Sequence, residues 1–126
     1  MKWLSRFEPY AYALLRVAAG LLFAQHGAQK MLGLLGGTRV PLASLAGVAG
    51  VIELVAGLSI AIGLLTRPLA FIASGEMAVA YFMMHAPGGP FPVQNRGELA
   101  ALYCFLFLYI ATRGTGAYGL SITKGR

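Results

Sequence analysis

The hydrophobic positions of this chain form four long runs, separated by short stretches of proline, glycine and arginine. A helix needs about 20 residues to cross a hydrocarbon core of roughly 30 Å, and each run approaches that length. Strands of a membrane barrel would alternate with a period of two, which these runs do not sustain. The predicted helices are residues 10–34, 42–65, 68–86 and 97–113. We therefore expect one all-α domain over residues 1–126, an integral membrane bundle of four transmembrane helices.

Composition and charge support this assignment. Hydrophobic residues make up 58% of the chain and charged residues 11%, whereas soluble domains carry about 25% charged residues. The net charge is +6, but the basic residues lie at the ends of the runs and form no basic face, so nucleic acid is not an expected partner. Lys2, Arg6, Arg67, Arg113, Lys124 and Arg126 flank one side, and Lys30, Arg39 and Arg96 flank the other. Because cytoplasmic loops retain Lys and Arg, we expect both termini in the cytoplasm and a multi-pass protein surrounded by membrane lipid.

Each predicted helix places its polar and small residues on one stripe, with the i, i+3, i+4 spacing of a helix face. Lipid disfavours charge, and close helix contacts favour small residues, so we expect these stripes to face the interior of the bundle. The four stripes are Arg16, Ala19, Gly20, Phe23, His26, Gly27 and Lys30; Ala46, Ala49, Gly50, Glu53, Ala56, Gly57 and Ile60; Leu69, Ile72, Ala73, Glu76, Val79, Ala80 and Met83; and Glu98, Ala101, Leu102, Phe105, Tyr109 and Thr112.

The depth of each charge follows from a rise of 1.5 Å per residue. Arg16 and Glu76 fall at similar depth, which predicts a buried ion pair. Glu53 falls near the midplane without an obvious partner, so we expect either a protonated Glu53 or a cationic His26. His85 lies half a turn from Glu76 on an ideal helix and joins the same site only if the helix is distorted before Pro87.

Structural roles compete with chemical ones at these positions. The pair of Arg16 and Glu76 could serve only to fix helix register, and Lys30 could extend to the membrane surface as an anchor. Glu98 could cap the fourth helix, where a carboxylate favours the helix dipole. We expect no metal site, because two histidines and one glutamate on separate helices lack ligand spacing.

Several short motifs, taken in order, are similar to those of the DoxX family of small bacterial membrane proteins. They are Arg16 with Gly20, His26-Gly27 and Lys30; Gly50-x-x-Glu53 with Gly57; Gly63-Leu64-Leu65-Thr66-Arg67; Glu76-Met77 with His85; Gly97-Glu98-Leu99; and Gly114-x-Gly116. The family tail usually has an acidic residue where Ser121-Ile122 is followed here by Thr123. The resemblance implies a four-helix subunit of the bacterial inner membrane, associated with quinone-linked oxidoreductases or with membrane redox and stress complexes.

The resulting hypothesis is a subunit that interacts with a quinone or quinol. His26, Glu53, Glu98 and Tyr109 could supply hydrogen bonds and protons from an apolar groove, with His85 as a further candidate. We expect no intrinsic cofactor, and electrons would then come from a membrane or soluble redox partner. Three alternatives stay open: haem held by His26 and His85, a non-enzymatic membrane scaffold that packs densely and holds a soluble redox partner, and a conduit for protons or small solutes. Another copy of the chain, in a homo-oligomer, is a further candidate partner.

Overall fold

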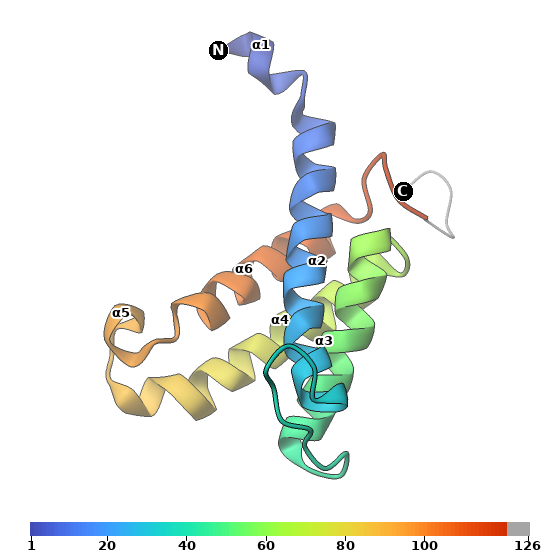
Figure 1. Ribbon diagram of the computed structural model, residues 1–126. Coiled ribbons are helices and arrows are strands. Elements are labelled where there is room, and N and C mark those ends of the chain that lie inside the picture. The colour runs from blue at the N-terminus through green and yellow to red at the C-terminus, as the bar shows by residue number, and fades with distance from the viewer. Residues whose placement is uncertain (121–126) are drawn as a thin grey trace.

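The chain is all-helical over the residues that the computed structural model describes, which are residues 1–120 (Figure 1). No strand occurs in that range, so the predicted fold class is confirmed as far as its helical character. The elements are α1 (Lys2–Ser5), α2 (Glu8–Leu32), α3 (Leu45–Ile62), α4 (Thr66–Ala80), the π-helical turn η1 (Tyr81–His85), the 3₁₀ turn η2 (Ala86–Gly88), α5 (Pro92–Asn95) and α6 (Glu98–Arg113). Within residues 1–120, two stretches are long and apolar enough to span a membrane, namely Leu45–Ile62 and Thr66–Gly88.

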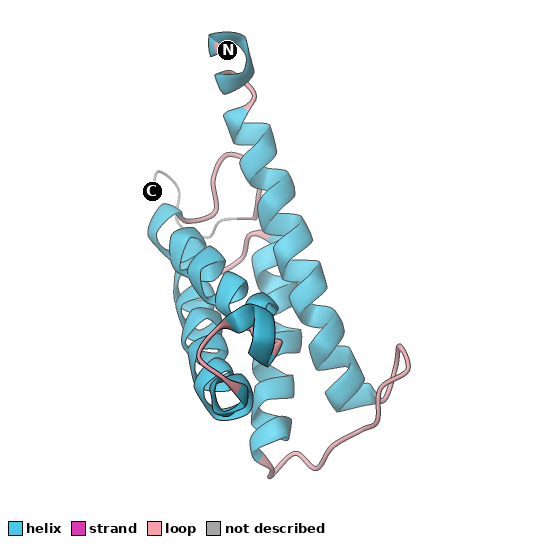
Figure 2. Ribbon diagram, turned by 90° about the vertical axis from the view of Figure 1, so that its left-hand side faces the viewer, coloured by secondary structure: helices cyan, strands magenta, loops and turns pink. Residues whose placement is uncertain are grey.

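The long helices pack as two antiparallel pairs (Figures 1 and 2). The first pair is α2 with α3, and the second is α4 and η1 with α6. The pairs meet around four side chains that are fully buried, Phe23 of α2, Ile60 of α3, and Phe107 and Ile110 of α6. The Phe23 ring lies 4.8 Å from that of Phe107. Beyond this contact the second pair projects away from the first, so the molecule has two arms joined near one end.

Glycine allows α2 and α3 to approach at backbone distance. A Cβ atom at Gly57 would lie 2.6 Å from the carbonyl oxygen of Gly20, and one at Gly27 would lie 2.3 Å from the nitrogen of Leu54. Such distances exclude any side chain, so the small residues on the predicted stripes of the first two helices are the contact surface itself. Most residues of both stripes are buried, with Arg16 and Glu53 included, whereas His26 and Ala46 are exposed and Lys30 and Ala49 are half-buried.

Local signals set the helix ends, and they shift the predicted boundaries by a few residues. Gly33 and Gly63 adopt left-handed conformations with φ of 65° and 82° and end α2 and α3. The predicted helices continued to residues 34 and 65, because apolar residues follow both glycines. At the start of α3, the Ser44 side chain accepts a hydrogen bond of 3.0 Å from the amide of Gly47, as expected of an N-cap.

The third predicted helix changes its type along its length. It is α-helical as α4 up to Ala80, then forms a π turn from Tyr81 to His85 and a 3₁₀ turn from Ala86 to Gly88. Pro87 lies in this last turn, where its nitrogen cannot donate a helical hydrogen bond. The wider π turn advances each residue by a smaller angle than an α-helix does, which changes the direction in which His85 points.

The predicted inward face of the fourth helix is wrong. The buried residues of α6 are Ala100, Tyr103, Phe107 and Ile110, whereas Phe105 is 70% and Tyr109 50% exposed. The sequence of α6 is apolar on all sides, so only Glu98 distinguished a face, and that residue lies in the first turn where it is exposed.

We predict that Gly57→Ala lowers stability by about 1 to 3 kcal/mol, the usual cost of overpacking a tight contact. The added methyl group would collide with the backbone of α2. The matched control is Gly75→Ala, because no atom lies within 4 Å of a Cβ atom placed there, and alanine favours a helix by about 1 kcal/mol over glycine. Thermal unfolding in detergent, followed by circular dichroism, measures both. Equal melting temperatures for the two variants would contradict the close α2 and α3 contact.

Candidate functional site

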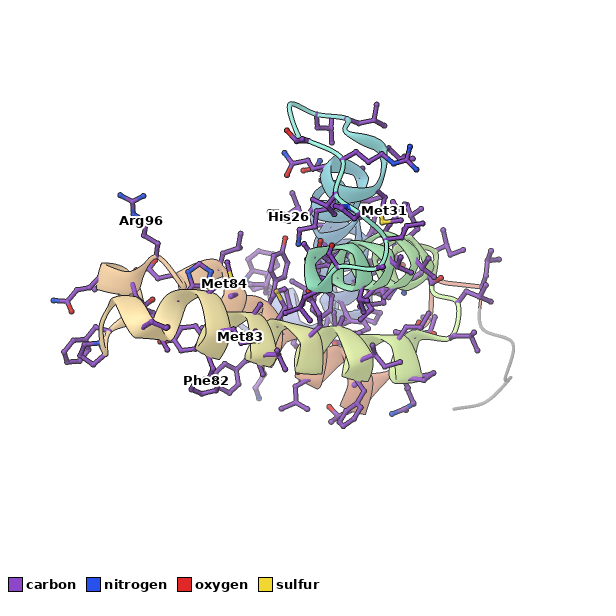
Figure 3. The ribbon with its side chains drawn as sticks, turned by 90° about the horizontal axis from the view of Figure 1, so that it is seen from below. His26, Met31, Phe82, Met83, Met84 and Arg96 are labelled. Atoms are coloured by element: carbon purple, nitrogen blue, oxygen red, sulfur yellow. The ribbon has the colours of Figure 1, made fainter. Side chains whose placement is uncertain are left out.

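A groove with a volume of about 1020 Å³ lies between the two helix pairs. Figure 3, seen from below, shows His26 on one arm and Met84 and Arg96 on the other, along the corner between them. Most of its lining is aliphatic, aromatic or methionine side chains from α2, α3, α4, η1 and α6. The polar or ionisable residues that line it are His26, Lys30, Glu53, Glu76, His85, Arg96 and Tyr103. The arrangement suits a largely apolar ligand with a few polar atoms.

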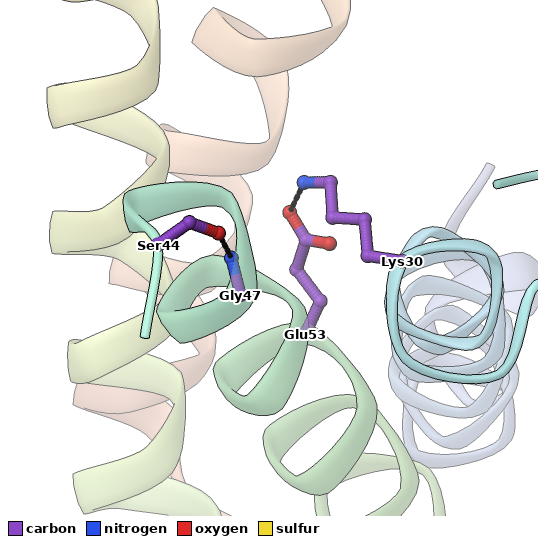
Figure 4. A network of polar contacts seen from close by, with 4 residues as sticks. All are labelled: Lys30, Ser44, Gly47 and Glu53. Carbon is purple, nitrogen blue, oxygen red and sulfur yellow. Dashed lines mark hydrogen bonds and ion pairs between the residues drawn. The ribbon is translucent and has the colours of Figure 1, made fainter. Parts of the chain in front are cut away.

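Lys30 and Glu53 form an ion pair across the two helices of the first pair (Figure 4). The Nζ atom of Lys30 donates to Oε1 of Glu53 over 2.8 Å. The Glu53 side chain is 3% exposed, and that of Lys30 33%. Lys30 therefore points inward along the groove, and its predicted role as an anchor at the membrane surface is wrong. The pair also supplies the partner that Glu53 was expected to lack.

Glu76 of α4 brings a second carboxyl group to this pair. It lines the same groove as Glu53 and Lys30 and lies close enough to both for their charges to act on it. One oxygen of each carboxyl, Oε2, is buried and has no hydrogen-bond partner among residues 1–120. Buried polar atoms are rarely left without a partner, so these two acceptors mark a place in the wall of the groove, closed to solvent, where a donor is missing.

The predicted ion pair between Arg16 and Glu76 is not formed. Arg16 is 2% exposed, and its guanidinium donates to the carbonyl oxygens of Ile60 over 3.0 Å, Ala61 over 3.4 Å and Tyr118 over 2.5 Å, and also to that of Thr115. Ile60 and Ala61 belong to the last turn of α3, where the helix dipole favours a cation. The pair was predicted only from the similar depths of Arg16 and Glu76 in the membrane. Depth could not show that free backbone carbonyl groups lie nearer to Arg16 than Glu76 does.

The two histidines both line the groove. His26 is exposed on α2, one turn before Lys30. His85 joins Glu76 in the groove because of the π turn, which supplies the required distortion before Pro87. Its Nδ1 atom lies 3.2 Å from the carbonyl oxygen of Asn95.

Asn95 fixes the segment that holds His85. Its side chain is buried and donates to the carbonyl oxygen of Gly89 over 2.9 Å and to the hydroxyl of Tyr81 over 3.1 Å. It also accepts a hydrogen bond of 2.8 Å from the amide of Gly97. Sequence reasoning missed this residue because a lone asparagine in a Pro-rich and Gly-rich loop is usually a turn residue.

Glu98 and Tyr109 lie outside the groove. Glu98 lines a separate hollow of about 460 Å³ with Arg96 and Leu102. Tyr109 packs edge to face against Tyr12, with 6.1 Å between the ring centroids. In their place α6 contributes Tyr103, which the prediction omitted because it lies on the opposite face from Glu98.

Two other sequence features are the expected lack of a metal site and the tail motif. Among residues 1–120, no group of three or more His, Cys, Asp or Glu side chains is placed to hold a metal ion. The tail motif Ser121-Ile122-Thr123, together with the basic residues Lys124 and Arg126, lies outside the described residues.

Comparison with known proteins identifies the relatives of this chain. The sequence model described as DoxX matches residues 11–86, a range that includes His26, Lys30, Glu53, Glu76 and His85. An uncharacterized protein of Haemophilus influenzae is 42% identical over 127 aligned positions, which cover 95% of each chain. No solved structure matches the chain.

We predict that Lys30→Met destabilises the protein by more than Glu8→Gln does, because removal of Lys30 leaves the buried Glu53 without a counter-charge. The loss should fall below the ~3 to 5 kcal/mol of a fully buried pair, since a third of the Lys30 side chain is exposed. Glu8 pairs with Arg113 at an exposed site, where such pairs contribute about 0 to 1 kcal/mol.

Combining Lys30→Met with Glu53→Met completes this test. The double variant should recover most of the lost stability, because no unpaired charge then remains. Thermal unfolding of the three variants in detergent gives the coupling free energy. Additive losses would show that the two side chains do not interact.

Proposed function

Because the chain belongs to the DoxX family of membrane proteins, we propose that it binds a quinone or quinol in the groove between its helix pairs. The observation that carries the proposal is the composition of this groove, which is mostly apolar and also contains the ion pair of Lys30 and Glu53, Glu76 and both histidines. A quinone has an apolar ring and tail, and its ring oxygens need hydrogen bonds and a source or acceptor of protons.

Lys30, Tyr103 and His26 can donate hydrogen bonds to a ring oxygen, and Glu53 and Glu76 can exchange protons with it. Both carboxyl groups border the same apolar space as Phe71 and Met83. We place the electron source or acceptor in a membrane or soluble redox partner, so this chain is the ligand-binding subunit of an oxidoreductase or redox-stress complex.

Haem binding is the second candidate, because His26 and His85 line one groove and come from different helices. The surroundings favour the quinone. A porphyrin needs the groove to be apolar between its axial ligands, and Lys30, Glu53 and Glu76 border the same space. A scaffold role would require only the close packing of α2 on α3. It would not explain why the groove contains the buried carboxyl groups of Glu53 and Glu76.

We further propose that the four long helices span the bacterial inner membrane with both termini in the cytoplasm. The outer faces of the helices are apolar, as Leu14, Phe82 and Phe105 show with about 70% exposure. The segment before residue 121 returns to the N-terminal half of α2, where Tyr118 stacks on Tyr10 with 5.2 Å between the rings. Both ends of the described chain therefore lie on the side that carries most basic residues.

We predict that Ala49→Trp abolishes quinone binding, because Ala49 lines the groove and the indole would occupy it. The matched control is Val55→Trp, also on α3, since Val55 is exposed and does not line the groove. Binding of a decyl-substituted benzoquinone to protein in lipid nanodiscs is measured by calorimetry. Equal binding by the two variants would place the ligand elsewhere, and no binding by the parent protein would contradict the proposed function.

The topology predicts where a membrane-impermeant maleimide reacts. In a Cys104→Ser background, which lacks the native thiol, Thr38→Cys and Val93→Cys should be labelled in intact cells. Ser5→Cys should be labelled only after the membrane is broken, because it lies on the cytoplasmic side. Labelling of all three positions in intact cells, after checks that the membrane is sealed, would contradict the orientation.

A further inference from the structure

Resting on the proposed function, we infer that Tyr103 of α6 holds the ring of the quinone or quinol, through a hydrogen bond between its hydroxyl and one ring oxygen. Tyr103 lines the groove and is buried, yet its hydroxyl forms no hydrogen bond within residues 1–120. The bond would place the ligand ring at the closed end of the groove, beside the point where the two helix pairs meet.

Tyr103 differs from Tyr12, the other tyrosine of residues 1–120 that is more than nine-tenths buried. Tyr12 is 5% exposed, and its hydroxyl donates to the carbonyl oxygen of Gly114 over 2.5 Å. Tyr103 is 6% exposed, but no donor or acceptor of the described chain lies within hydrogen-bond reach of its hydroxyl. A buried tyrosine hydroxyl usually has a partner, so a ligand oxygen in the groove is the expected partner of this one.

The Tyr103 hydroxyl is open to the groove. In residues 1–120, the unpartnered side-chain atoms that are closed to solvent are Oε2 of Glu53, Oε2 of Glu76 and Nε of Arg113. The Tyr103 hydroxyl is unpartnered but is not one of them, so it retains accessible surface. Because the rest of the residue is buried and Tyr103 lines the groove, this surface faces the groove.

Aromatic packing fixes the direction of this hydroxyl. The Tyr103 ring stacks on that of Phe107, with 5.4 Å between the centroids and 9° between the planes, and lies 5.5 Å from the ring of Phe23. Both phenylalanines are fully buried where the helix pairs meet. A donor that is already held in place loses little freedom on binding. The ligand tail would then extend toward the open part of the groove, which Met83 and Met84 line.

The inferred bond serves both redox forms of the ligand. A tyrosine hydroxyl donates and accepts hydrogen bonds, so it can donate to a quinone oxygen and can donate to or accept from a quinol hydroxyl. Lys30 is available to a second ligand oxygen, because its side chain is one-third exposed and Glu53 accepts only one of its hydrogens. The inference therefore concerns the position of the ring and makes no choice between the two forms.

The first test measures the protein without ligand. Tyr12→Phe removes a hydrogen bond to Gly114 and should lower the melting temperature in detergent. Tyr103→Phe removes a hydroxyl that has no partner within residues 1–120, and phenylalanine keeps the ring stacking, so its melting temperature should not fall. A loss as large as that of Tyr12→Phe would show that the Tyr103 hydroxyl is bonded within the protein, and would overturn the inference.

The second test measures binding of a decyl-substituted benzoquinone to protein in nanodiscs by calorimetry. We expect Tyr103→Phe to raise the Kd about fivefold, the usual worth of one hydrogen bond between uncharged groups. The matched control is Tyr109→Phe, the same substitution on the same helix. Tyr109 does not line the groove, so this variant should bind as the parent does.

Infrared spectroscopy separates a direct bond from an effect on packing. A carbonyl that accepts a hydrogen bond absorbs at lower frequency than a free one. With the quinone labelled by ¹³C at its ring carbonyls, Tyr103→Phe should move one carbonyl band of the bound ligand to higher frequency, and Tyr109→Phe should move none. Weaker binding without this shift would show that the hydroxyl does not bond the ring oxygen, which overturns the assignment.

The outcomes also separate this inference from the function on which it rests. If the parent and both variants bind the quinone with the same Kd and the same carbonyl bands, Tyr103 does not hold the ring, and the proposed function stands without the inference. If the parent binds no quinone, both fail.

Discussion

The close contact between Gly20 of α2 and Gly57 of α3 is the constraint on which the rest of the structure depends. Without side chains at these positions, the two backbones approach until the peptide groups touch. The same contact sets the register in which Lys30 reaches Glu53 over 2.8 Å. In a membrane the lipid is as apolar as the helix surface, so such packing, rather than burial of apolar area, holds helices together. A shift of one turn would separate the ion pair and leave the buried carboxylate of Glu53 without its counter-charge.

Polar contacts at one end of the molecule join the two arms and also close the second arm. Arg16 of α2 binds the last turn of α3 and the segment that follows α6, which joins the arms. Arg67 of α4 binds the carbonyls of Ala111 and Arg113 on α6, within the second arm. The hydroxyls of Thr66 and Thr115 add a contact of 2.8 Å. Farther along, the arms diverge and the groove opens between them. The fold thus combines a fixed end with an open one, and the ionisable groups of the groove lie beyond the fixed end.

Residue patterns predicted the first pair better than the second. On α2 and α3, glycine and charged residues recur on one face. Close helix contact favours glycine and lipid disfavours charge, so both place this face in the interior, and the sequence pattern predicts most of the buried residues. On α6 nearly every residue is apolar, and in lipid an apolar residue is equally suited to the outside and the inside. The sequence pattern therefore does not distinguish the face that contains Tyr103 and Phe107 from the other faces of α6. The direction of His85 depends on a π turn, which follows from hydrogen bonding around Pro87 and not from helical periodicity.

The incorrect pairing of Arg16 with Glu76 shows why Glu76 does not form an ion pair with Arg16. Had Arg16 met Glu76, each carboxylate would have its own cation, and the groove would contain two closed ion pairs and no free acceptor. Carbonyl groups at the end of α3 satisfy Arg16 instead, because partial negative charge gathers there. Lys30 pairs with Glu53, and Glu76 forms no ion pair among residues 1–120. This difference between the two carboxyl groups therefore depends on where α3 ends, which Gly63 determines.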